Sequence, residues 1–272
     1  MINNEVLGVD RSVAFSDTEL SILTGINVKA IGFYLGGPYY SINGWKPEDL
    51  QRVLNSGFGV MPIYVGQNFV KGSVPPILTA EQGGIDGTNA VQLINLFFND
   101  KRVSGSIALD MERSTWEYNS NGATEYAKAW VDTVKKAGFK AGIYSSLDIF
   151  DRMIREGEPP SFMWIANWVS KGIDSYVSLD RIPGVPTTIF TDNQRCWQYS
   201  GNTPIHGLEN GVDINLFDSE LLMYKEVAVI NNVPIPTVVD TETAQQEIQD
   251  NVDIEKAIAF MESAISILKG IN

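Results

Sequence analysis

Eight short apolar segments recur along about the first four-fifths of the chain, and stretches with a helical pattern separate most of them. The segments are residues 6–10, 30–35, 59–65, 106–112, 140–145, 162–168, 196–200 and 211–216. Strands that alternate with helices are typical of βα units and a parallel sheet. Eight of them within 272 residues predict a (β/α)8 barrel of the TIM type over about residues 5–222. An open doubly wound sheet is the competing fold, but no glycine-rich phosphate loop follows the first segment.

The connections carry helix signals. Ser16 with Glu19 three residues later has the pattern of a capping box, and Pro47 suits the first turn of a helix. Further helices are expected over residues 79–99, 123–137 and 147–156. Residues 201–210, between the last two segments, are few and have no helical pattern. We therefore expect one barrel helix to be missing near the last strands.

A change of character near residue 224 predicts three parts: a barrel over residues 1–224, an extended linker over 225–240 and an amphipathic helix over 241–272. In this C-terminal helical extension apolar residues alternate spacings of four and three, as in a short coiled coil. They are Ile254, Ile258, Met261, Ile265 and Leu268. This stripe either packs on the barrel of its own chain or forms a homo-oligomer.

The charge balance narrows the class of partner. With 33 acidic and 20 basic residues the net charge is −13, which disfavours nucleic acid and anionic membrane surfaces as partners. A neutral glycan is indifferent to this charge. No segment is apolar for long enough to span a bilayer, so we expect no membrane insertion.

Location and cofactors are less constrained. The first ten residues show no signal peptide, which fits a trimmed secreted form or a cytoplasmic protein. The single cysteine, Cys196, excludes an intramolecular disulfide. The single histidine, His206, lies in a loop without a matching ligand cluster, so we expect no metal and no cofactor.

Two carboxylates stand close together in the fourth segment. Asp110 and Glu112 are two residues apart, and side chains at i and i+2 of a strand point to the same face. Their repulsion tends to raise one pKa, so that one carboxyl stays protonated while the other is ionised, as acid/base chemistry requires. The alternative is structural: one of the acids caps the next helix or pairs with Arg113.

The barrel hypothesis favours the functional alternative, because barrel active sites lie at the C-terminal ends of the strands. Polar and aromatic residues recur at these ends. The four acids there are Asp10, Asp110, Glu112 and Asp213. The candidate substrate-binding residues are Tyr34, Tyr64, Gln67, Tyr144, Trp164, Asn167, Trp197 and Gln198. Trp168, Tyr199 and Asn215 stand at similar positions. Such a set could stack sugar rings and hydrogen-bond their hydroxyls.

The motifs, taken as an ordered set, resemble a known family. GVDRS, LDME, GIYSS, WIANW, WQYS and GVDIN are similar to segments of the family 25 glycoside hydrolases, the lysozyme-type muramidases. FYLGG, PIYVGQ, AEQGGIDG and NQRCWQYSG look closer to a sister group, the glycoside-hydrolase-like barrels known as a domain of unknown function. The resemblance covers roughly residues 7–217.

This resemblance implies roles for the acids. Glu112 would be the general acid that protonates the leaving glycosidic oxygen, and Asp110 would orient the N-acetyl group of the substrate or stabilise the oxocarbenium-like transition state. Asp10 and Asp213 would line the same cleft. Tyr34, Tyr64, Tyr144 and Trp197 would contact sugars.

The implied activity is hydrolysis of peptidoglycan or a related N-acetylated glycan, as by an N-acetylmuramidase. With this activity, the missing signal peptide also suits a phage-type lysin that acts at the cell wall. Two other classes stay open, because a fold does not fix a function. One is a catalytically inactive barrel that binds glycan or cell wall. The other is an interaction protein that self-associates through the C-terminal helix.

Overall fold

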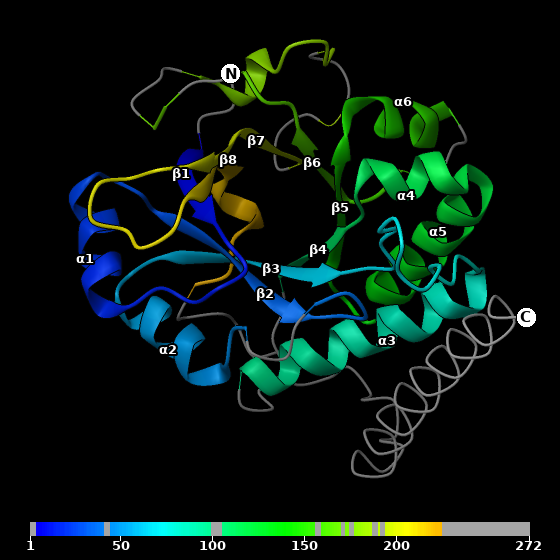
Figure 1. The fold of residues 1–272 in the computed structure, drawn as a ribbon, viewed down its shortest axis with the longest axis horizontal. Coiled ribbons are helices and arrows are strands. Elements are labelled where there is room, and N and C mark those ends of the chain that lie inside the picture. Colours follow the sequence, from blue (N-terminus) through cyan, green and yellow to red (C-terminus); the bar gives the residue numbers. More distant parts are fainter. Residues whose placement is uncertain are drawn as a thin grey trace, which may run out of the picture. The chain divides into compact units, whose positions relative to one another are not determined.

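Eight strands close into one barrel in sequence order, which confirms the α/β barrel (Figure 1). The strands are β1 (Glu5–Asp10), β2 (Ala30–Gly36), β3 (Gly59–Val65), β4 (Ser106–Asp110), β5 (Lys140–Ser146), β6 (Phe162–Ala166), β7 (Arg195–Thr203) and β8 (Val212–Asp218). The computed structural model describes residues 4–40, 44–98, 105–155, 159–169, 172–173, 177–186, 190 and 194–224. The linker and helix expected over 225–272 lie outside the described residues.

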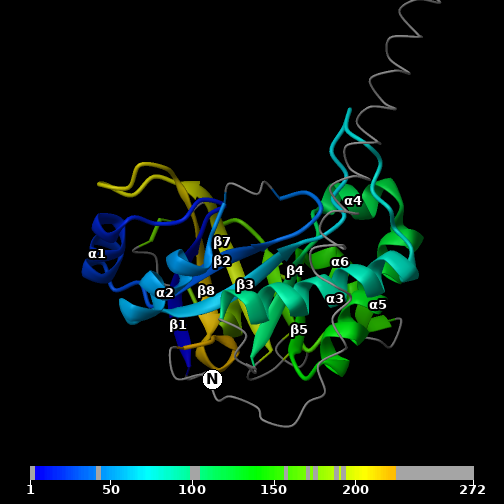
Figure 2. The same cartoon turned by 90° about the horizontal axis from the view of Figure 1, so that it is seen from below.

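Six α-helices follow the first five strands in the part of the chain that is described (Figures 1 and 2). They are α1 (Asp17–Gly25), α2 (Pro47–Asn55), α3 (Ala80–Phe97), α4 (Arg113–Tyr118), α5 (Ser120–Lys136) and α6 (Leu147–Arg155). Ser16 caps α1 in a complete capping box with Glu19, as predicted. The short helix α4 was not predicted. None of the helices described here is long and apolar enough to cross a membrane.

The last strand departs from the parallel sheet that the sequence predicts. β1 to β7 pair in parallel, but β8 runs antiparallel to both β1 and β7. The physical reason is the short connection: residues 204–211 contain no helix, and a parallel crossover needs a dozen residues or more. This confirms the prediction that no barrel helix connects the last two strands. Between β6 and β7 the described residues form only a 3-10 turn, η1 (Leu179–Arg181).

Side chains alternate between two cores. The larger core lies between the strands and the helices and includes Phe33, Tyr64 and Trp130. The smaller core fills the barrel interior. Its members are Ala30, Met61, Ile63, Ala108, Phe162, Trp164, Cys196 and Phe217, with Leu221 and Leu222 from the chain after β8. Adjacent residues of a strand therefore contribute to different cores, which decides which strand-end residues can reach the site.

Glycines make room for the aromatic rings inside the barrel. A Cβ atom built on Gly142 of β5 would overlap the Phe162 ring, and one on Gly8 of β1 would overlap Phe217. By contrast, a Cβ atom on Gly25, at the end of α1, meets nothing within 4 Å.

We expect Gly142→Ala to lower the free energy of unfolding by about 1–3 kcal/mol, because overpacking forces side chains or strands to shift. Denaturant unfolding measures this change, with Gly25→Ala as the matched control, which should leave stability unchanged or slightly raised. Equal stability of the two variants would contradict a tightly filled barrel interior.

Candidate active site

Four carboxyl groups gather at one end of the barrel. Asp10 and Asp110 are the last residues of β1 and β4, and Glu112 follows β4 by two residues. Asp213 is the second residue of β8, and its Cα is paired with that of Asp10. The sequence predicted Asp213 at a C-terminal strand end, which is wrong. The antiparallel direction of β8 brings its beginning, instead of its end, to this side of the barrel.

The four acids differ in their exposure to solvent. Asp10 is buried, with 1% of its surface exposed. Asp110 and Asp213 are half-buried, and Glu112 is exposed. The set therefore runs from the barrel interior to the rim. None of the four acids takes part in an ion pair within the described ranges.

Gln198 of β7 links two of these acids to two aromatic side chains. Its Nε2 donates to Asp213 Oδ2 at 3.2 Å and, at a longer 3.5 Å, to Asp10 Oδ2. Its Oε1 accepts from Tyr144 Oη at 2.8 Å and from Trp168 Nε1 at 2.9 Å. Because an indole N–H can only donate, Trp168 determines which end of the amide faces the acids.

A second set of hydrogen bonds fixes the carboxyl group of Asp10. Asn215 Nδ2 donates to Asp10 Oδ2 at 2.7 Å, and Tyr34 Oη lies 3.1 Å from Asp10 Oδ1. The Trp164 indole in turn donates to Asn215 Oδ1 at 3.0 Å. Trp164 thus supports the site from the barrel interior, with 1% of its surface exposed.

Burial and like charge raise the pKa values of the acids. Burial, with the nearby charge of Asp213, raises the pKa of Asp10 to about 7, although hydrogen bonds from Asn215, Tyr34 and Gln198 favour the ionised form. Burial raises the pKa of Asp110 well above its usual range, and the charges of Glu112, Asp10 and Asp213 add to this effect. Burial raises the pKa of Asp213, against a hydrogen bond from the Asn202 N–H.

Glu112 also has a raised pKa, from partial desolvation of its carboxyl and then from the charge of Asp213. The alternative that this residue caps the next helix or pairs with Arg113 is not observed. Glu112 occupies the N-cap position of α4, but its side chain makes no capping hydrogen bond. Arg113 bonds Glu117 instead, with 2.8 Å between Nε and Oε1.

Asn68, which the sequence analysis missed, holds the turn that carries Glu112. Its buried side chain donates to the Asp110 carbonyl at 3.3 Å and accepts from the Glu112 N–H at 2.8 Å and the Thr115 hydroxyl at 3.1 Å. The sequence signal that could have identified Asn68 is its position just beyond β3, next to Gln67.

Four of the predicted substrate-binding residues lie elsewhere. Tyr64 and Trp197 face the helices, because they alternate with inward residues of their strands, and each is 2% exposed. Gln67 is buried and bonds Asp86 and the Ile77 N–H. Asn167 is half-buried, and its amide donates to the Pro183 carbonyl. By contrast, Tyr34 and Gln198 bond the acids directly, and Tyr144 reaches them through Gln198. Trp164 is linked to Asp10 through Asn215.

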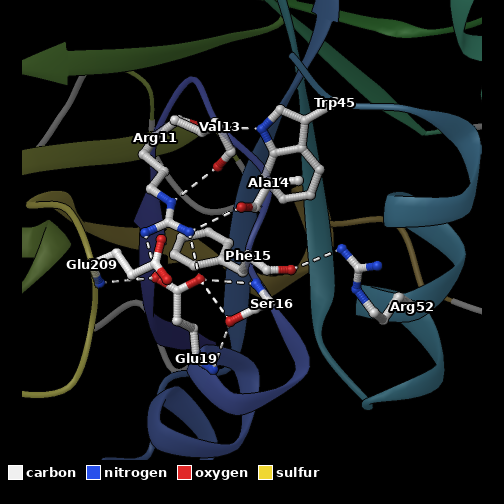
Figure 3. Close-up of polar contacts among 9 residues, drawn as sticks. All are labelled: Arg11, Val13, Ala14, Phe15, Ser16, Glu19, Trp45, Arg52 and Glu209. Carbon is white, nitrogen blue, oxygen red and sulfur yellow. Dashed lines mark hydrogen bonds and ion pairs between the residues drawn. The ribbon is translucent and has the colours of Figure 1, made fainter. Parts of the chain in front are cut away.

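Arg11, the cation next to Asp10 in sequence, is bound to Glu19 (Figure 3). Its guanidinium forms two hydrogen bonds of 2.7 Å with Glu19 and stacks over the Phe15 ring at 4.0 Å. Glu19 also accepts from the Glu209 N–H in the β7–β8 connection. Although burial opposes ionisation of Glu19, these hydrogen bonds dominate and lower its pKa to about 2. Arg11 therefore anchors the loop after β1 without neutralising the site.

The described residues offer no metal centre. Among them, no group of three or more His, Cys, Asp or Glu side chains could hold a metal ion.

The fold and the site together define the class of protein: an α/β barrel with a cluster of acids at one end. The family model of the Rv2525c-like, glycoside hydrolase-like domain matches residues 23–219, and the chain belongs to this family. No curated protein gave a significant match.

Solved structures with the same fold share little sequence with this chain. The Tat-secreted protein Rv2525c of Mycobacterium tuberculosis is 16% identical, with 78% of this chain and 94% of that chain covered and a TM-score of 0.53. The catalytic domain of endolysin ply40 from Listeria bacteriophage P40 is 17% identical, with coverage of 78% and 93% and a TM-score of 0.53. A family 25 glycosyl hydrolase from Bacillus anthracis is 15% identical, with coverage of 80% and 90% and a TM-score of 0.51. At these identities the likeness shows the fold.

The raised pKa of Asp10 makes a prediction about stability. Between about pH 4 and pH 7 the folded chain keeps a proton on Asp10 that the unfolded chain releases, so stability falls as the pH rises through this window. We expect Asp10→Asn to raise the free energy of unfolding by about 1–3 kcal/mol near pH 8, with a gain that shrinks toward pH 4.

Denaturant unfolding at several pH values measures this effect. Asp132→Asn, at an exposed position on α5, is the matched control and should change stability little at any pH. A pH-independent effect of Asp10→Asn would show that Asp10 titrates as an ordinary carboxyl.

Proposed function

We propose that this chain hydrolyses the glycan strands of peptidoglycan, as an N-acetylmuramidase of the lysozyme type does. The observation that carries the proposal is the cluster of four carboxyl groups with raised pKa values and no ion-pair partner among the described residues. Such a cluster costs folding stability, and acid/base catalysis is the chemistry that uses carboxyls of this kind. Membership of a glycoside hydrolase-like family supports the same reaction class.

Glu112 has the properties of the general acid. It is the most exposed of the four, so a glycosidic oxygen can approach its carboxyl. Its raised pKa increases the fraction that still carries a proton at neutral pH. Asn68 fixes the backbone on which Glu112 stands, which limits the positions that its carboxyl can take.

Asp110 is suited to contact the substrate beside the bond that breaks. Its buried Oδ1 has no hydrogen-bond partner in the described part of the chain. An unpaired buried oxygen costs about 1–3 kcal/mol, unless a ligand supplies the missing partner. The N–H of an acetamido group is a donor that fits this oxygen. Once Asp110 is ionised, its charge would stabilise an oxocarbenium-like transition state.

Two of the structural neighbours support a cell-wall glycan as the substrate. One is named as the catalytic domain of a phage endolysin and the other as a family 25 glycosyl hydrolase. The substrate of this chain is inferred by analogy with them.

We expect Glu112→Gln to lower kcat on purified peptidoglycan by about 100-fold or more, because the amide cannot deliver a proton to the leaving oxygen. Release of reducing sugar measures the rate. Glu117→Gln is the matched control, since Glu117 lies on α4 and is exposed in an ion pair with Arg113. This control should keep activity near that of the wild type.

The same assay discriminates the alternatives. No release of reducing sugar by the wild type on several wall types would contradict hydrolysis. Retention of the protein on insoluble peptidoglycan in that case would support a glycan-binding barrel.

The pH dependence offers a second test. The charge of Asp213 raises the pKa of Glu112, so Asp213→Asn should lower this pKa. Because the general acid must be protonated, the alkaline limb of the kcat/KM profile should move to lower pH. The profile is measured from about pH 4 to pH 9, with Asp132→Asn as a control that leaves it in place. An unmoved alkaline limb in Asp213→Asn would exclude Glu112 as the group that this limb reports.

A further inference from the structure

One tryptophan of six is exposed. The indoles of Trp45, Trp116, Trp130, Trp164 and Trp197 are 5% exposed or less, whereas Trp168 has 61% of its surface exposed. A single exposed apolar residue needs no explanation by itself. The way in which Trp168 is held does call for one, because its surroundings fix the ring while leaving it open to solvent.

Backbone hydrogen bonds fix the segment that carries Trp168. Beyond the end of β6, the Asn167 N–H donates to the Gln198 carbonyl at 3.1 Å, and the Val169 N–H donates to the Tyr199 carbonyl at 2.9 Å. The Trp197 indole also donates to the Asn167 carbonyl at 2.9 Å. The residues on both sides of Trp168 are therefore tied to β7.

The ring itself is fixed by two further contacts. Its Nε1 donates to Gln198 Oε1, and the benzene part of the indole lies against Gly201, where a Cβ atom would overlap the ring. The ring has thus already lost much of the rotational freedom that binding would otherwise remove. An exposed and preorganised aromatic face is what a stacking ligand requires.

The position of the ring connects it to the acids. Gln198, to which Trp168 donates, also donates to Asp213 Oδ2 at 3.2 Å. Only one side chain therefore separates the exposed indole from the carboxyl cluster. A ligand on the Trp168 face would lie next to the groups assigned to catalysis.

We propose that Trp168 is a sugar-binding platform, which stacks on a pyranose ring of the glycan and positions the chain beside the four acids. This inference rests on the proposed function, and it names a residue that binds the substrate at that site. A pyranose ring presents C–H groups on its face and hydroxyls at its edge, so it can cover an indole while bonding the polar groups around it. Anionic ligands are disfavoured by the neighbouring carboxyls.

A soluble tetrasaccharide of N-acetylglucosamine, the uncharged sugar of peptidoglycan glycan strands, serves as the probe. The full chain is used as Glu112→Gln, so that the probe is not cut. Acrylamide quenching of tryptophan fluorescence reports on Trp168, because the other five indoles are buried. We expect the probe to reduce quenching and to bind in isothermal titration with little dependence on salt, since it is neutral.

Two substitutions separate stacking from the indole hydrogen bond. Trp168→Ala should weaken binding about tenfold, whereas Trp168→Phe, which keeps a ring but loses the N–H, should weaken it about threefold. Tyr224→Ala is the control: Tyr224 is 41% exposed but lies against Gly59 at the start of β3, at the opposite end of the barrel from the acids. Binding by this control should be unchanged.

Three outcomes would overturn the inference. Equal affinity of Trp168→Ala and the parent would exclude the platform and leave the proposed function intact. Equal losses in Trp168→Ala and Trp168→Phe would assign the effect to the hydrogen bond to Gln198 and not to stacking. If the parent binds no probe and the wild type releases no sugar, the proposed function fails, and the platform fails with it.

Discussion

The antiparallel pairing of β8 is the constraint on which the rest of this structure depends. Closure of the barrel requires an eighth strand between β7 and β1, and the short connection after β7 lets that strand run only in the opposite direction. This reversal turns the beginning of β8 toward the end of the barrel where β1 to β7 finish. Asp213 and Asn215 consequently reach Asp10, although they precede the end of their strand.

The site that results is electrostatically unfavourable, and its neutral neighbours limit the cost. Two cations are adjacent to the acids in sequence, and both are paired elsewhere: Arg11 with Glu19 (Figure 3) and Arg113 with Glu117. Asp10 and Asp213 are stabilised instead by amide and hydroxyl donors, chiefly Gln198, Asn215 and Tyr34. Neutral donors lower the pKa values less than an arginine would, so the carboxyls can still carry protons near neutrality. The site thus gives up stability for a set of groups that can exchange protons.

Much of the fold could be predicted from the sequence, because apolar runs and caps are local signals. The third strand has the predicted bounds, the second helix begins at Pro47, and Ser16 caps α1 as expected. The direction of β8 was not accessible to strand patterns, which do not encode direction. It could have been inferred from the short connection after β7.

The site was only partly predictable for a different reason. Asp10, Asp110 and Glu112 lie at the strand ends where the sequence placed them, whereas Asp213 lies at the beginning of its strand. A list of strand ends also ignores the alternation of faces. Trp197 and Gln198 are adjacent and cannot both face inward, and a strict period of two would have assigned Trp197 to the helices. Trp168 and Asn68 lie beyond the strands, where no period applies. Their contacts could be found only from the tertiary structure.

The hydrogen bonds around Gln198 also determine where a proton on Asp10 can lie. Because Oε1 accepts from Tyr144 and Trp168, the amide presents Nε2 to the acids. Asp10 Oδ2 faces this donor and also accepts from Asn215, so a proton on that oxygen would meet two N–H groups. The proton must therefore lie on Oδ1, next to the Tyr34 hydroxyl, which can accept as well as donate. Ionisation of Asp10 then requires only that this hydroxyl turn from acceptor to donor, a small change that keeps the buried carboxyl bonded in both states.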